Sequence, residues 1–219
     1  MDRHVLAVRR GRARPLPYRG SMVQSGIVKD PVDGAVAVTH LGLEGDEQAD
    51  LSVHGGVDKA LYLYAQGDYD WWQGELGREV PSGIFGENLT VSGDGISDVR
   101  IGDQFAIGGV VISASEPREP CFKLGARMGD QGFLTRFREA GRTGFYARVL
   151  TEGEVTAGDR ITLEKAGDPR NPTIAEVHRL YVQGRDDIEG LQGALHGPDV
   201  PDGWREWFEK RLEETLRRG

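Results

Sequence analysis

The sequence predicts a mainly β protein with an α-helical C-terminal part, and three observations support this. Glycine is frequent, at 32 of 219 residues, which is about twice its average share. Many of these glycines separate short strand-like runs up to about residue 165, as in an all-β barrel or sandwich. Beyond residue 172, apolar residues recur at helical spacing. The predicted boundaries are a β domain at 1–165, a linker at 166–172 and a three-helix domain at 173–219.

Glycine turns mark the predicted strands. Gly108 and Gly109 separate two apolar runs within IGDQFAIGGVVISAS, residues 101–115, as the two-residue turn of a β-hairpin does. The tripeptides IGD (101–103) and AGD (157–159) each precede a strand-like run, as turn entries do. This pattern predicts short strands joined by tight turns.

One helix is expected to interrupt these strands. It covers GDYDWWQGELG, residues 67–77. Asp68 is a favourable N-cap residue, and Gly77 is a favourable residue for ending a helix.

The C-terminal part is predicted to form three short amphipathic helices. AGDPRNP, at 166–172, has the proline and glycine content of a linker. Thr173 and Glu176 form a capping-box pattern at the start of the first helix, and the second helix covers 186–197. The third begins at Asp202 and carries an apolar stripe. The stripe comprises Trp204, Trp207, Phe208, Leu212 and Leu216.

Composition and charge limit the function classes. Lys and Arg number 27 and Asp and Glu number 35, so the net charge is −8. A nucleic-acid polymer, which requires a basic face, is therefore not an expected partner. The single cysteine excludes an internal disulfide framework, a Cys-rich zinc site and a cysteine-ligated iron–sulfur cluster. We find no stretch suited to a signal peptide or a membrane span, and we expect a cytoplasmic protein with no membrane association.

The one cysteine lies in SEPREPCFKL, residues 115–124. Pro117 and Pro120 predict a rigid turn before Cys121 rather than a strand interior. Arg118 and Lys123 would favour the thiolate, which is a nucleophile or a ligand for a soft metal. The alternative is a small core cysteine between two solvated charges.

A second candidate segment is HGGVDKALYLY, a glycine-rich loop that leads into a strand. Gly55 and Gly56 allow a ligand to approach the backbone closely, and Lys59 could meet an anion. His54 and Asp58 complete the set of polar residues. His54 is as consistent with capping the loop as with acting on a substrate, and a cysteine hydrolase that pairs it with Cys121 is conceivable.

Three further polar residues interrupt apolar segments. Asn88, in FGENLT, either fixes a turn or recognises a ligand. Arg142 and Arg148 lie in GRTGFYARVL, and Arg148 falls within a predicted strand. An arginine there is costly unless it is paired or faces a polar pocket.

Five motifs in this order resemble the MOSC domain, which is named for the C-terminal domain of molybdenum cofactor sulfurase. They are HGGVDKALYLY, FGENLT, IGDQF, SEPREPCFKL and GRTGFYARVL. The three predicted C-terminal helices resemble the 3-alpha appendage of the bacterial YiiM-like subgroup. The resemblance therefore spans nearly the whole chain, and it implies a strongly curved β-barrel.

The resemblance also implies a cofactor and a chemistry. Cys121 matches the thiolate ligand to molybdenum in family members that act as reductases. His54 and Asp58 would shape the pocket or relay protons. The residues expected to bind the molybdenum cofactor, a phosphorylated molybdopterin, are Gly55, Gly56, Lys59, Asn88, Arg118, Lys123, Arg142 and Arg148.

The implied activity is reduction of N-hydroxylated compounds such as 6-hydroxylaminopurine, a mutagenic base analogue. No haem or dinucleotide motif occurs in the sequence, so we expect electrons from a separate reductase of flavoprotein or ferredoxin type. Two alternatives use the same cysteine. One is a metal-free sulfur carrier with a persulfide on Cys121, and the other is a non-catalytic binding module in which Cys121 is structural.

The sequence departs from the family pattern at two positions. Glu116 stands where glutamine is expected, and Ala65 stands where proline is common. Neither change removes an expected ligand. The added negative charge of Glu116 bears on substrate preference more than on cofactor binding.

Overall fold

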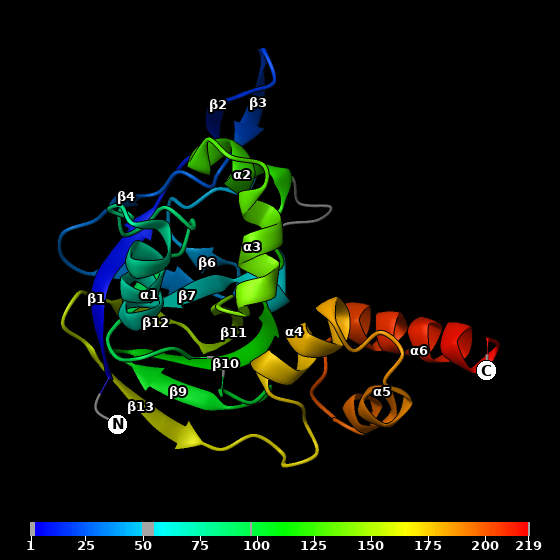
Figure 1. The fold of residues 1–219 in the computed structure, drawn as a ribbon. Helices are drawn as coiled ribbons and strands as arrows, with labels where there is room; N and C mark the ends of the chain where they lie inside the picture. The colour runs from blue at the N-terminus through cyan, green and yellow to red at the C-terminus, as the bar shows by residue number, and fades with distance from the viewer. Residues whose placement is uncertain (1–2, 50–54, 97, 219) are drawn as a thin grey trace.

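The structure, a computed structural model, describes residues 3–49, 55–96 and 98–218. Within these ranges seven strands form a closed barrel, because β1 pairs back to β13 through Arg3 and Ile161 (Figure 1). In spatial order the barrel strands are β13 (Arg160–Lys165), β9 (Gln104–Ile107), β10 (Val110–Pro117), β11 (Phe145–Thr151), β7 (Leu61–Ala65), β8 (Leu89–Val91) and β1 (Arg3–Arg10). The predicted mainly β fold with helices is confirmed.

Smaller strands extend this barrel. β4 (Asp30–Pro31) pairs with β1, and a three-stranded sheet joins β12 (Gly153–Val155), β5 (Val36–Thr39) and β6 (Gly42–Leu43). β2 (Arg14–Tyr18) and β3 (Ser21–Ser25) pair with each other and project from the barrel as a hairpin (Figure 1).

The predicted glycine turns are confirmed. Ile107 and Val110 pair directly, so Gly108 and Gly109 form the two-residue loop between β9 and β10. Gly108 has a φ of 57°, a left-handed conformation that glycine adopts at little cost. IGD and AGD immediately precede β9 and β13.

The predicted helix is present as α1 (Gln66–Leu76), and it ends at Gly77 with a φ of 60°. The prediction that Asp68 is its N-cap was wrong. Strand β7 runs directly into the helix, so the extended residue Ala65 takes the N-cap position. Asp68 lies in the first turn, where its buried carboxylate pairs with Arg142 at 2.6 Å.

The expectation of a single helix within the β region was also wrong. A short 3-10 helix η1 (Val57–Lys59) and two α-helices, α2 (Phe122–Met128) and α3 (Phe133–Ala140), lie between barrel strands. Helix α3 is stabilised by full burial of Phe133 and Phe137, which join Trp72 in a second aromatic core. Burying such a side chain contributes about 1.5–3 kcal/mol, which offsets the poor intrinsic helix propensity of a short segment bounded by glycines.

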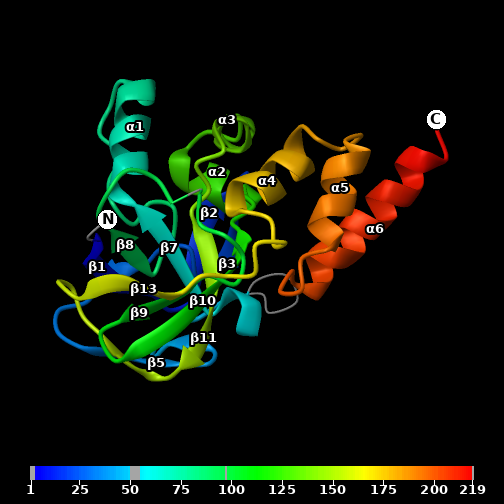
Figure 2. The ribbon, with the colours of Figure 1, turned by 90° about the horizontal axis from the view of Figure 1, so that it is seen from below.

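The three predicted C-terminal helices are present as α4 (Ile174–Val182), α5 (Ile188–Leu195) and α6 (Asp202–Leu216). The capping box of Thr173 and Glu176 forms as expected. In the apolar stripe of α6, Phe208 is fully buried, but Leu216 is 57% exposed. Helix α4 packs nearest the barrel, and α5 and α6 lie side by side beyond it (Figure 2).

Helix α4 shares its apolar face with the barrel interior. Ile174, Val177 and Leu180 are buried in the same hydrophobic cluster as the strand residues Ile112 and Ala147. This burial is the main source of the docking free energy between α4 and the barrel, because short isolated helices are marginal in water. In the described part of the chain, no helix has both the length and the apolar character needed to cross a membrane.

Candidate functional site

Cys121 stands between the end of strand β10 and the start of helix α2. Its backbone is extended, with φ −109° and ψ 168°, and it occupies the N-cap position of α2. Pro120 fixes the chain immediately before it. The next residue, Phe122, packs its ring 4.7 Å from that of Tyr18 on the projecting hairpin. Cys121 as a residue is half-buried.

Cys121 lines a cleft with about 650 Å³ of space that is partly open to solvent. The predicted site residues on its walls are Gly55, Lys59, Asn88, Arg118, Cys121 and Lys123. Wall residues that the sequence did not single out include Lys29, Glu47, Tyr62, Phe85, Glu119 and Tyr146. The cleft therefore combines one thiol, several cations and aromatic rings.

Arg118 is the most buried cation of the cleft, with 5% of its surface exposed. Its guanidinium lies 5.6 Å from the ring centres of both Tyr62 and Phe137. Burial lowers the pKa of Arg118, but the neighbouring Tyr62, Tyr146 and Cys121 outweigh burial and the net pKa is raised. Its Nη1 atom is buried and has no hydrogen-bond partner within residues 3–49, 55–96 and 98–218. A buried donor without an acceptor is costly, so this atom suits an anionic guest.

Lys59 reaches the cleft from η1 and is held by Glu116. Its Nζ lies 3.2 Å from Oε1 of Glu116, and Oε2 of the same carboxylate accepts a hydrogen bond from Nε1 of Trp204 at 2.9 Å. Burial raises the pKa of Glu116, while Lys59 and Trp204 partly counteract that rise. Glu116 thus joins a cleft lysine to helix α6.

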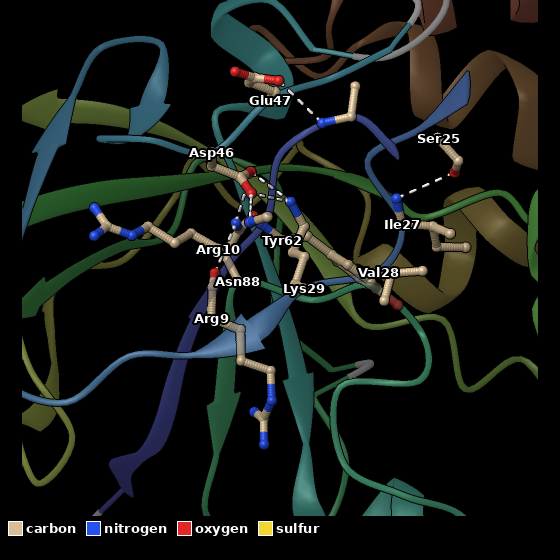
Figure 3. Close-up of polar contacts among 12 residues, drawn as sticks. Arg9, Arg10, Ser25, Ile27, Val28, Lys29, Asp46, Glu47, Tyr62 and Asn88 are labelled. Carbon is tan, nitrogen blue, oxygen red and sulfur yellow. Dashed lines mark hydrogen bonds and ion pairs between the residues drawn. The ribbon is translucent and has the colours of Figure 1, made fainter. Parts of the chain in front are cut away.

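A buried polar cluster that sequence reasoning missed lies on another wall (Figure 3). Nζ of Lys29 lies 2.5 Å from both carboxylate oxygens of Asp46. Asp46 also accepts hydrogen bonds from the backbone N–H of Gly11 at 2.9 Å and from Nδ2 of Asn88 at 3.0 Å. Burial lowers the pKa of Lys29, and Asp46 opposes this shift. No sequence spacing relates Lys29 to Asp46, because the chain brings them together only through the barrel.

Asn88 belongs to this cluster. Its Oδ1 accepts the backbone N–H of Tyr62 at 3.0 Å, and its Nδ2 donates to the carbonyl of Arg9 at 3.3 Å as well as to Asp46. These bonds join β1, β7 and the loop that carries Asp46. The amide is therefore committed to protein partners, which favours the structural alternative for Asn88 over ligand recognition.

Several expected site residues are not brought to the cleft. Arg148 forms an ion pair with Asp58, so each of these two neutralises the other. Arg142 pairs with Asp68 and lies 4.6 Å above the ring of Trp71. Gly56, with a φ of 85°, caps η1 and does not line the cleft. His54 lies outside the described residues.

Few of the described side chains in this cleft can ligate a metal ion. In residues 3–49, 55–96 and 98–218, no group of three or more His, Cys, Asp or Glu side chains is arranged to hold a metal ion. Cys121 is the soft donor on the cleft wall. The arrangement suits a metal that arrives within an anionic, aromatic ligand.

Comparisons with known families and structures agree with this fold. A model described as "MOSC domain" matches residues 50–162, and a model described as "YiiM-like, 3-alpha helix domain" matches residues 172–215. Protein YiiM of Escherichia coli is 33% identical over 89% of this chain and 89% of its own length. The crystal structure of YiiM from Geobacillus stearothermophilus is 30% identical, with a TM-score of 0.79 over 96% of this chain and 99% of that chain.

Two further relatives are matched over very different shares of their own length. YflK of Bacillus subtilis is 34% identical over 97% of this chain and 96% of its own length. A protein named "Reductase" from Gibberella moniliformis is 36% identical over 76% of this chain but only 30% of its own length. The chain is therefore similar to a part of that longer protein.

Proposed function

The chain belongs to the MOSC domain family, and from that premise we propose that it is an oxidoreductase that binds a molybdenum cofactor in the Cys121 cleft and reduces N-hydroxylated compounds. One observation carries this proposal. The half-buried Cys121 lines the same cleft as Arg118, whose buried Nη1 has no hydrogen-bond partner among the described residues. A soft metal ligand and an unsatisfied anion donor are the two features that such a cofactor requires.

The cleft residues fit the group. Cys121 would supply the protein sulfur ligand. Arg118, Lys59 and Lys123 would balance the negative charge of a phosphorylated pterin, with Arg118 donating from Nη1. Arg142 and Arg148 have no cofactor contact in this proposal, because each is paired elsewhere.

Aromatic residues would hold the flat part of the guest. Tyr62, Phe85 and Tyr146 line the cleft, and the rings of Tyr62 and Tyr146 lie 5.1 Å apart. Aromatic faces pack well on a planar ring and exclude water from it. Gly55, with a φ of 93°, would let the ligand approach the backbone.

When bound, such a cofactor supplies two-electron chemistry. The overall reaction converts R–NHOH, two electrons and two protons to R–NH₂ and water. Cys121 is the single cysteine of the chain, so the chain cannot hold a four-cysteine iron–sulfur cluster of its own. We therefore assign electron supply to a separate reductase of flavoprotein or ferredoxin type. The similarity to part of a longer protein named "Reductase" supports an oxidoreductase.

Metal analysis tests the proposal. The protein is expressed in a host that makes molybdenum cofactor, beside Cys121→Ser and the control Ser21→Ala, an exposed serine on the projecting hairpin. We expect about one molybdenum per chain in the wild type and the control, as one thiolate ligand implies, and loss of the metal in Cys121→Ser. With a reconstituted electron donor, the metal-loaded wild type should reduce 6-hydroxylaminopurine.

Two results would overturn this function. Metal-free protein that carries cyanide-labile sulfur on Cys121 would favour the sulfur carrier. Metal-free protein without such sulfur would favour a binding module.

A further inference from the structure

The C-terminal helices reach the cysteine loop at two polar contacts. In one, Trp204 of α6 donates to Glu116. In the other, His178 of α4 bonds to Glu119. The two carboxylates flank Arg118 in the sequence, and Glu119 itself lines the cleft. Both contacts therefore act on the segment that carries Arg118 and Cys121.

The contact of His178 is a partly buried charged pair. Its Nδ1 lies 2.8 Å from Oε1 of Glu119, and its Nε2 lies 2.7 Å from the carbonyl oxygen of Arg138. Both ring nitrogens thus face oxygen acceptors, which two N–H donors satisfy only in the imidazolium form. His178 is 4% exposed and the Glu119 side chain is 22% exposed, so the pair is only partly screened by water and salt.

Arg138 also holds the loop that carries Cys121, and it contacts the His178–Glu119 pair. Arg138 of α3 donates from Nη2 to the carbonyl of Pro120 at 3.1 Å, and its Nε lies 3.7 Å from Oε2 of Glu119. His178 holds the backbone of Arg138 from the other side. The two residues that directly precede Cys121 are therefore held by α3 and α4 together.

Trp204 acts on the cleft through one intermediate residue, Glu116. Glu116 shares its carboxylate between Trp204 and Lys59, and Lys59 lines the cleft. Without the indole donor, the buried carboxylate would depend more on Lys59. The lysine would then be drawn toward Glu116 and away from an anion in the cleft.

We infer that His178 and Trp204 are positioning residues through which the C-terminal helices set the geometry and charge of the Cys121 cleft. The inference rests on the proposed function, because it concerns how the Cys121 cleft receives an anionic guest. Apolar burial of α4 already docks the helices on the barrel. The two polar contacts link the docked helices to the cleft, since each contact is made with a residue that lies on or next to the cleft wall.

The test uses metal-free protein, so its outcome does not depend on molybdenum loading. Cys121 is the single thiol, and its rate of modification is measured with 5,5′-dithiobis(2-nitrobenzoate), which is anionic, and with neutral iodoacetamide. The variants are Trp204→Phe, which keeps a packed ring, and His178→Gln, which keeps one amide donor. Arg211→Gln is the matched control, because Arg211 pairs with Asp186 within the C-terminal helices.

The inference predicts different results for the two probes. Trp204→Phe should slow the anionic probe about fivefold, the factor that corresponds to one ordinary hydrogen bond, and leave the neutral probe within twofold. His178→Gln should change both rates, because it releases the loop itself. The control should change neither rate. The inference is overturned if both variants react like wild type with both probes, or if Arg211→Gln reproduces their changes.

Discussion

The ammonium group of Lys29 lies 2.5 Å from both carboxylate oxygens of Asp46 on the wall of the cleft. Their side chains are only 7% and 2% exposed. A buried pair of this kind contributes little over an apolar pair, but removal of one partner leaves an uncompensated charge. Asp46 also holds Gly11 and Asn88, so the pair supports the cleft wall as well.

Asp46→Ala is therefore expected to lower the free energy of unfolding by about 3–5 kcal/mol. Urea unfolding followed by circular dichroism measures the change. The control is Asp30→Ala, which breaks the exposed pair with Arg14 and should cost about 0–1 kcal/mol. Equal losses in the two variants would contradict a buried role for Asp46.

The ion pair of His178 makes the stability dependent on pH. Burial lowers the pKa of His178, but Glu119 and the Arg138 carbonyl outweigh it, so the folded-state pKa is raised above 6.5. The folded state binds the proton more tightly than the unfolded chain, so the stabilisation is fully present below pH 6.5 and is lost as pH rises through the raised pKa. The unfolding free energy of wild type minus that of His178→Gln should therefore shrink from pH 6 to pH 9. A difference that grows with pH would contradict a raised pKa.

Arg118 and Arg142 are expected to differ in cofactor binding. Arg118→Gln removes the buried donor of the cleft, and loss of a charge-assisted hydrogen bond should weaken cofactor binding about 10- to 100-fold. Arg142→Gln breaks the pair with Asp68 away from the cleft, so it should lower thermal stability and leave the molybdenum content unchanged. Metal content and melting temperature of the two purified variants distinguish these effects. Loss of molybdenum in Arg142→Gln but not in Arg118→Gln would contradict the assignment of cofactor binding to Arg118.

Glu116→Gln tests the role of the carboxylate that pairs with Lys59. The amide oxygen can still accept from Trp204, but the amide can no longer pair with Lys59. Lys59 should then be more available to an anion in the cleft. We expect faster reaction of Cys121 with the anionic disulfide probe, by about fivefold as one freed charge contact implies, and little change with iodoacetamide. A slower reaction with the anionic probe would show that Glu116 holds Lys59 in its binding position.

Local signals in the sequence predicted much of the fold. The Gly108–Gly109 turn and the capping box of Thr173 and Glu176 each depend on a few neighbouring residues, and both occur in the structure. Helices α2 and α3 were missed because both segments are short and end at glycines, so their local propensity is weak. They are stabilised by contacts such as that of Phe133 with Trp72, whose rings lie 4.8 Å apart.

The sequence by itself placed Cys121 in a loop outside the strand, because Pro120 directly precedes it and a proline restricts the chain locally. The expectation that Pro117 belongs to the same turn was wrong, since Pro117 is the last residue of β10 and pairs with Phe145. Only the tertiary structure decided which distant charges face one another. Arg148 meets Asp58 rather than the cleft, whereas Lys29 meets Asp46 on the cleft wall. His178 reaches Glu119 across 59 positions of the chain. Such partners are set by barrel closure and helix docking, and the identity of a charged residue in one sequence carries no information about which opposite charge the fold will place beside it.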